Sequence, residues 1–365
     1  MHTSFLPETA PILEEVSIEF FEDQVPEFVA PALSRLYGNI FSSLSHLQAS
    51  GAIAHSNTYV VRQGAELVTV FLLRWDKGRV HVVNEGMRID EAMIVRLADY
   101  VFKRFPQATS LCFHAVEHDV RSLPYPCHRY NFLEDIVVAL PRTEAEYFAC
   151  LGKSTQRYLT RYLTRSHRDF PTFSFEIYPG KEVQPQQIRS ILELYKNRMA
   201  GKKQRAEHGE ERLWKTLRRL QFGGFIGVIK IDGIICAGTI NFSEANNHFM
   251  EVLAHDPSFN AYRLGTLCCY LTICEGIRQG GREYHFLWGE YEYKYRLRGV
   301  KRKLDHLAVY RSRAQVARDL PLIAARAAHD GMRRVLARLR QFERQPGLTP
   351  RLVGAARSLA RALRA

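Results

Sequence analysis

The chain has 365 residues, of which 46% are hydrophobic and 24% charged, and its formal net charge is +13. These values exclude a wholly disordered chain and predict a large buried core, at a length typical of two domains. No apolar run approaches the roughly 20 residues of a membrane-spanning helix. The acidic first segment also lacks the form of a secretory signal, so we expect a cytoplasmic protein.

The seven cysteines form neither a Cys-x-x-Cys pair nor a zinc-binding spacing. We therefore expect reduced, mostly buried thiols and no metal ion. The positive charge is unevenly distributed: residues 1–60 hold one arginine and seven acids, whereas residues 311–365 hold thirteen arginines and three acids. A basic surface attracts the phosphates of a nucleotide cofactor, a nucleic acid or an anionic membrane. The net charge alone does not indicate which of these three partners binds.

Residues 1–143 predict an N-terminal domain in which strands surround one helix. The Asp76-Lys77-Gly78 step favours a hairpin turn between two strands, and apolar residues recur at helical spacing after Asp90. In chain order, the expected elements are strands at 57–62, 65–75 and 78–84, a helix at 89–105, and strands near 109–115 and 132–139.

Residues 144–220 predict a helical link. Arg157, Arg161 and Arg165 recur every four residues in it, which indicates either a solvated helix face or a contact with phosphate or nucleic acid. The polar, basic segment 200–211 is typical of a mobile loop beside a site.

The second half repeats the order of the first. Asp232-Gly233 is a strong hairpin signal, and two glycines after 262–279 favour a helix end. The expected elements are a hairpin at 225–242, a strand at 248–256, a helix at 262–281, and strands at 283–289 and 304–312. We therefore expect two α+β domains of similar build, the second spanning 144–312.

The arginine-rich tail, residues 313–365, predicts helices. Its last stretch, 350–365, places leucines on one face and Arg357, Arg361 and Arg364 on another. Such a basic amphipathic helix either docks on its own protein or lies on an anionic membrane surface, which here would be the inner membrane.

Two features of the second half favour binding of a phosphate-bearing ligand. Arg263, Leu264, Gly265 and Thr266 open a helix directly after a strand, where unpaired N–H groups attract an anion. The preceding strand, expected at 248–256, ends in the run 253–259, and a strand whose neighbour diverges can pair with an extended, amide-bearing ligand.

The run 252–299 resembles the GNAT superfamily branch called BioF2-like, or CelD/BcsL-type, acetyltransferases. The resemblance is carried by His255-Asp256-Pro257, by Gly265, and by the strand that leads to Gly289-Glu290 and Tyr293-Lys294. Together with the upstream hairpin and the arginine-bearing helix, it extends over about 145–312. Two such halves in one chain also resemble the Fem-type aminoacyltransferases. The resemblance implies tandem GNAT-like domains, each with a mixed, largely antiparallel sheet flanked by helices, followed by a basic helical tail.

Two positions depart from the family pattern. The phosphate loop of the family places a glycine where this chain has Arg263, so this arginine either holds the pyrophosphate or fills the groove and signals a different donor. The family has an aromatic residue where this chain has His255.

The resemblance implies direct transfer of an acyl group from acetyl-CoA, or another acyl-CoA, to an amine. Its implied donor-binding residues are Leu253, Ala254, Arg263, Leu264, Gly265 and Thr266. Glu251 is the expected base and Tyr293 the expected acid, and Lys294 is expected to meet a carboxylate or phosphate at the site mouth. His255, Trp288, Glu290 and Tyr291 are expected to bind the acceptor. For each residue the alternative is a packing or ion-pairing role.

Three hypotheses follow. The first is an acyl-CoA-dependent N-acyltransferase whose N-terminal domain is non-catalytic or binds the acceptor. The expected acceptor is an amine-bearing small molecule, a sugar or a peptide. The second is a Fem-type transferase that uses aminoacyl-tRNA, favoured by the charge and the arginine helix. The third is a degenerate GNAT pair that acts as a scaffold or at a membrane surface through its tail.

Overall fold

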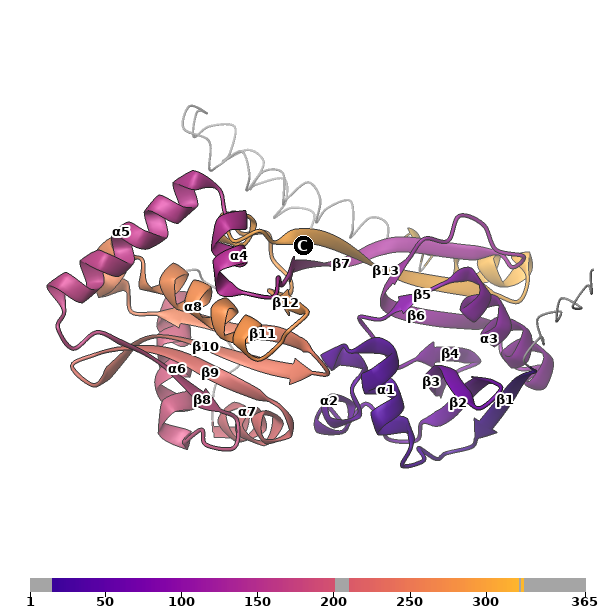
Figure 1. Cartoon of the computed structure of the whole chain (residues 1–365). Coiled ribbons are helices and arrows are strands. Elements are labelled where there is room, and N and C mark those ends of the chain that lie inside the picture. The colour runs from indigo at the N-terminus through magenta and orange to yellow at the C-terminus, as the bar shows by residue number, and fades with distance from the viewer. Residues whose placement is uncertain (1–14, 201–209, 322, 325–365) are drawn as a thin grey trace, which may run out of the picture.

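The computed structural model, which describes residues 15–200, 210–321 and 323–324, is an α+β fold built on one long mixed sheet (Figure 1). The N-terminal half contains β1 (Val16–Phe21), α1 (Val29–Tyr37), η1 (Ile40–Ser42), α2 (Leu44–Ala49), β2 (Asn57–Gln63), β3 (Glu66–Asp76), β4 (Arg79–Val82), β5 (Arg88–Ile89), α3 (Glu91–Arg104), β6 (Ser110–His118) and β7 (Cys127–Ala139). The second half contains α4 (Glu144–Cys150), α5 (Lys153–Asp169), β8 (Ser174–Pro179), α6 (Pro185–Ala200), α7 (Glu210–Phe222), β9 (Gly224–Ile231), β10 (Ile234–Glu244), β11 (Asn247–His255), η2 (Pro257–Tyr262), α8 (Leu264–Arg278), β12 (Glu283–His285), α9 (Glu292–Arg296) and β13 (Val300–Tyr310).

The 13-stranded sheet runs in the order β1-β2-β3-β4-β6-β13-β7-β12-β11-β10-β9-β8, with β5 paired to β6 outside this path. Neighbours pair antiparallel except in three places, β4–β6, β5–β6 and β11–β12. The pairs β4–β6 and β11–β12 each have a helix between their strands, α3 in the first half and α8 in the second. The two halves therefore share one plan, as the repeated order of elements predicts.

The long strands β7 and β13 connect the two halves (Figure 1). They pair antiparallel from Cys127 and Val309 to Val137 and Val300. At one end β7 pairs with β12, and at the other end β13 pairs with β6. The last strand of the chain thus completes the sheet of the N-terminal half, and the expected boundary at 143/144 falls between β7 and α4.

Each half buries apolar side chains on both faces of its sheet, because strand side chains alternate. In β3, Val70 and Leu72 face a core with α1 and α2, whereas Phe71 and Leu73 face α3. In the second half, α4, α5 and α8 cover one face and α6 and α7 cover the other.

The local predictions of the sequence are largely confirmed. The Asp232-Gly233 hairpin forms with both residues in the left-handed region (φ 52° and 77°), and the helices expected at 89–105 and 262–281 are α3 and α8. The expectation of a purely helical link is wrong, since it contains β8, which pairs with the edge of β9. Most of the loop expected at 200–211 and the amphipathic helix at 350–365 lie outside the described residues.

The start of the tail packs on the N-terminal half. Val316 and Ile323 contact the cluster around Tyr310, and Arg79 forms a 2.8 Å ion pair with Asp319. Among the described residues, no helix is long and apolar enough to cross a membrane.

Candidate active site

The parallel strands β11 and β12 separate after a short paired segment. They pair only from Asn247–Phe249 to Glu283–His285, and β11 then continues to His255 while remaining paired with β10 on its other side. The strand expected at 283–289 is therefore too long, because β12 ends at His285. Beyond Phe249, the described part of the chain supplies no second strand to this edge of β11, so its outward backbone groups can pair with an extended ligand.

A buried lysine holds the chain where it leaves the sheet. Leu287 has a left-handed backbone (φ 56°), which is unfavourable for a branched side chain. The Lys294 Nζ donates hydrogen bonds to the carbonyl oxygens of Phe286, Leu287 and Trp288, at 2.9, 3.1 and 2.8 Å. Burial lowers the pKa of Lys294 to about 8, although the charge of Asp135 acts in the opposite direction. The ammonium thus meets backbone carbonyls instead of the carboxylate or phosphate that the resemblance implies.

A buried ionic cluster fixes the last paired residue of β12. His285 stacks on Phe249 of β11, with ring centroids 4.2 Å apart, and its Nδ1 lies 2.7 Å from Asp135 Oδ2 of β7. Its Nε2 lies 3.3 Å from Glu283, which also binds Arg302 of β13. Burial lowers the pKa of His285, but the two carboxylates outweigh burial and raise it overall. The sequence did not predict this cluster, because its charged residues come from three strands, β7, β12 and β13.

The start of α8 is shaped by Arg263 and Gly265. The Asp256 side chain accepts from the Ser258 N–H and caps η2, and Arg263, with φ 56°, reverses the chain into α8. A Cβ on Gly265 would lie 2.7 Å from His255 Nδ1, so glycine is needed for this helix start to approach the end of β11. The Thr266 N–H donates to the Arg263 carbonyl at 3.0 Å, so the N–H groups of Leu264 and Gly265 are the ones that the helix start offers to an anion.

Helix α5 lies beside this helix start. The Arg165 guanidinium stacks on Tyr262 at 4.5 Å, and the Tyr262 hydroxyl donates to Asp169 at 3.0 Å. Desolvation raises the pKa of Tyr162, but hydrogen bonds with Arg161 and Arg263 outweigh it and lower the pKa. The arginine face of α5 therefore adjoins Arg263, and the two elements concentrate positive charge at the start of α8.

Glu251 occupies a β-bulge in β11. Ile240 pairs with Val252 and Asn241 with Met250, which leaves Glu251 as the additional residue. A bulge redirects its side chain, and the carboxylate forms a 2.5 Å ion pair with Arg219 of α7. Arg219 in turn lies 3.8 Å from the centre of the Phe242 ring. Glu251 thus lies on the face of the sheet covered by α6 and α7.

The remaining expected residues occupy three environments. Leu253 and Ala254 are buried in the cores on opposite faces of β11, so only their backbone groups can reach a ligand. Tyr293 packs edge-on against Phe286, with centroids 6.0 Å apart. Glu290 forms a 2.6 Å ion pair with Lys301 and accepts from the Tyr295 hydroxyl.

Two aromatic residues remain partly exposed next to the bend. Trp288 is 52% exposed, and its ring lies 5.6 Å from Phe41 of the N-terminal half. Tyr291 is 37% exposed and stacks on Tyr293. The structure thus brings two groups of expected residues together. At the start of α8 these are His255, Arg263, Gly265 and Thr266. At the bend they are Trp288, Tyr291, Tyr293 and Lys294, while Glu251 and Glu290 are held by ion pairs.

Comparisons with known proteins agree with this geometry. The family model of the acetyltransferase (GNAT) domain matches residues 154–295, and no curated protein matches the chain. Similar solved structures include FemX, with a TM-score of 0.58 and 9% identity over 79% of this chain and 96% of that chain. A conserved protein of unknown function from Bacteroides thetaiotaomicron VPI-5482 has a TM-score of 0.52 and 14% identity over 80% and 99%. L-PGS from Bacillus licheniformis has a TM-score of 0.50 and 12% identity over 83% and 97%.

At such low identities the likeness to these structures shows a shared fold. The family match is more specific, and it includes β11, α8 and β12. Residues 154–295, which contain both the separating strands and the helix start, therefore match an acetyltransferase (GNAT) domain, and the chain shares its fold with FemX.

Proposed function

We propose that the chain is an acyl-CoA-dependent N-acyltransferase of the BioF2-like branch, with acetyl-CoA as the simplest donor. The carrying observation is that β11 leaves β12 after Phe249 and continues to His255, which lies against Gly265 at the start of α8. The amide-bearing arm of coenzyme A can pair with the open edge of β11, and its phosphates can reach the first turn of α8 and Arg263.

In the proposed reaction, the nitrogen of a neutral amine attacks the thioester carbonyl and forms a C–N bond. The carbonyl oxygen becomes an oxyanion that backbone N–H groups near Leu253 and Ala254 stabilise. The C–S bond then breaks, the thiolate takes a proton, and the amine nitrogen loses one. Alignment of donor and acceptor along one strand supplies much of the rate.

We assign the proton transfers to two residues. Glu251 is the proposed base, since it is the sole acidic residue of β11 and the bulge directs it off the regular pleat. Tyr293 is the proposed proton donor to the thiolate, because it lies at the start of α9 beside the bend. Lys294 supports both proton transfers, because it holds the segment Phe286–Trp288 away from β11.

Calorimetric titration with acetyl-CoA tests the donor site. Thr266→Asp puts a negative charge in the first turn of α8, where it suits the helix dipole but repels phosphates. We expect wild type to bind acetyl-CoA and Thr266→Asp to bind at least about tenfold more weakly. Ser154→Asp makes the same kind of change in the exposed first turn of α5 and should bind as wild type does. No binding at high micromolar acetyl-CoA, or equal binding by Thr266→Asp, would contradict the proposal.

The second candidate donor is aminoacyl-tRNA. The specific observation in its favour is the position of α5, whose Arg157 and Arg161 are exposed and whose Arg161 adjoins the same helix start as Arg263. This candidate requires tRNA binding that weakens steeply as the salt concentration rises. Changing Arg157, Arg161 and Arg165 together to glutamine should weaken tRNA binding and also make it less dependent on salt. Micromolar or weaker binding that the triple change leaves intact would exclude it.

A further inference from the structure

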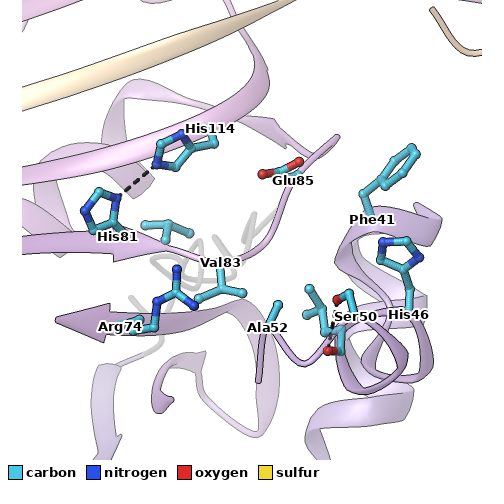
Figure 2. A pocket seen from close by; sticks show the side chains of 11 residues that line it. Phe41, His46, Ser50, Ala52, Arg74, His81, Val83, Glu85 and His114 are labelled. Atoms are coloured by element: carbon cyan, nitrogen blue, oxygen red, sulfur yellow. Dashed lines mark hydrogen bonds between the residues drawn. The ribbon is translucent and has the colours of Figure 1, made fainter. Parts of the chain in front are cut away.

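The N-terminal half also contains a parallel strand pair with a helix between its strands. β4 pairs with β6 from Arg79–Val82 to Ser110–Phe113 and then ends, whereas β6 continues to His118 and is bound there by the segment that follows β4, through Gly86, Met87 and β5. A cavity of about 300 Å³ lies where the chain leaves β4. It is lined by residues of η1, α2, β3, β4 and β6 and of the segments that follow α2 and β4, and Figure 2 shows them around the open space.

Two opposite charges line this cavity and have no partner in the described part of the chain. Arg74 of β3 and Glu85, which follows β4, both line it. Neither side chain makes a hydrogen bond or an ion pair with any described residue, and they do not pair with each other across the cavity. Burial raises the pKa of Glu85, and the buried Nδ1 of His46 also has no hydrogen-bond partner among the residues that the structure describes. Glu85 is half-buried, whereas Arg74 is exposed, so it is the unpaired carboxylate whose burial costs free energy that a complementary ligand recovers.

The wall of the cavity is held in place by a chain of imidazoles. His81 Nδ1 lies 3.0 Å from His114 Nε2, and His114 Nδ1 lies 3.0 Å from His306 Nδ1 on β13. Tyr130 stacks on His306, with centroids 4.8 Å apart. On the opposite side, Phe41 packs against both His46 and Trp288. The cavity is therefore preformed and is separate from the start of α8.

The chemistry of the ligand follows from the two charges. A guanidinium binds a carboxylate through two parallel hydrogen bonds, and a carboxylate binds an ammonium. The volume of about 300 Å³ is at the lower end of the range for small-molecule sites, so we expect a small ligand. We propose that this cavity binds a small zwitterion, with its carboxylate on Arg74 and its ammonium on Glu85.

Saturation-transfer NMR and calorimetry on the full chain test this site. The probes are β-alanine, 4-aminobutanoate and 6-aminohexanoate, which differ in the spacing of amine and carboxylate, with butanoate and butylamine as singly charged controls. At least one of the three amino acids should bind, and both controls should bind at least tenfold more weakly. If none of the three binds, or if a singly charged control binds equally well, the proposal is overturned.

Variants locate the binding. Arg74→Gln and Glu85→Gln should each weaken the amino acid at least tenfold, while Arg74→Lys, which keeps the charge, should lose less. Arg121→Gln and Glu182→Gln change the same charges at exposed positions outside the cavity and should bind as wild type does. Unchanged binding by Arg74→Gln and Glu85→Gln would overturn the assignment. Both variants should keep their circular dichroism and their acetyl-CoA binding, which separates this site from the donor site.

Discussion

The ammonium of Lys294 donates a 3.1 Å hydrogen bond to the carbonyl oxygen of Leu287, a residue with a left-handed backbone. A leucine in this conformation persists only where its surroundings enforce it. Lys294 lies in the short helix α9 and also binds the carbonyls on either side of Leu287. The separation of β12 from β11 is therefore built into the fold.

Replacing Lys294 with methionine should destabilise the protein. The change keeps the apolar stem but leaves three carbonyl oxygens without their donor, and we expect a loss of about 2–4 kcal/mol in the free energy of unfolding. Urea denaturation measures this loss. Lys303→Met, at an exposed position of β13, should change stability by less than about 0.5 kcal/mol. Equal stability of the two variants would show that the contacts of Lys294 do not hold the bend.

The stability of the wild type should rise with pH in a window set by Lys294. Burial lowers the pKa of Lys294 from 10.5 to about 8. Between these values the unfolded chain binds more protons than the folded chain, so deprotonation favours folding. The stability difference between wild type and Lys294→Met should grow in favour of wild type by about 1–3 kcal/mol from pH 8 to 10.5, and stay level below pH 8. Stability curves that remain parallel across this window would contradict a buried, shifted lysine.

Gly265→Ala should disturb the donor site through His255. The new Cβ would lie 2.7 Å from His255 Nδ1, so the ring or the helix start must move. We expect acetyl-CoA binding to weaken about tenfold and stability to fall by about 1–2 kcal/mol. Removing the ring as well, in His255→Ala/Gly265→Ala, should restore much of the stability, which thermal unfolding can follow.

The control for this experiment is Gly152→Ala. Gly152 precedes α5, and a Cβ there meets no atom within 4 Å. It should bind acetyl-CoA as wild type does. If the double variant remained as unstable as Gly265→Ala, the contact between His255 and Gly265 would not be the cause.

Glu251→Gln should lower kcat by about 100-fold or more while the KM for acetyl-CoA changes little, as expected for loss of a general base. The measurement is CoA release with an accepted amine. Glu193→Gln, on an exposed position of α6, provides the matched control. Arg219→Gln removes the ion-pair partner of Glu251 and distinguishes a catalytic role of Glu251 from a structural one. If Glu251 only stabilises the fold, Glu251→Gln and Arg219→Gln should lower stability equally and leave kcat unchanged.

The candidate site was only partly predictable. The sequence located the start of α8, because a glycine beside a helix start after a strand is a local pattern. It did not reveal that Glu251 pairs with Arg219, because these residues are 32 positions apart in the chain. It also did not reveal that His285 lies between Asp135 and Glu283, because Asp135 is 150 positions from His285 and the contact depends on strand pairing. One missed element was within reach: Phe175 and Ile177 alternate with polar residues in β8, a strand signal inside the region assigned to helices.

The sequence alone determined the elements that neighbouring residues specify: the Asp232-Gly233 hairpin, the amphipathic α3 and the glycine-terminated α8. Turn chemistry and apolar spacing act within a few residues, so they can be seen without a structure. Where β12 ends was decided by the tertiary structure. The alternation of Tyr284, Phe286 and Trp288 favours a longer strand, but Lys294 binds the carbonyls of the second half of that run and bends it away. Strand pairing and buried ion pairs join segments that are distant in the chain, and their geometry exists only once the sheet has assembled.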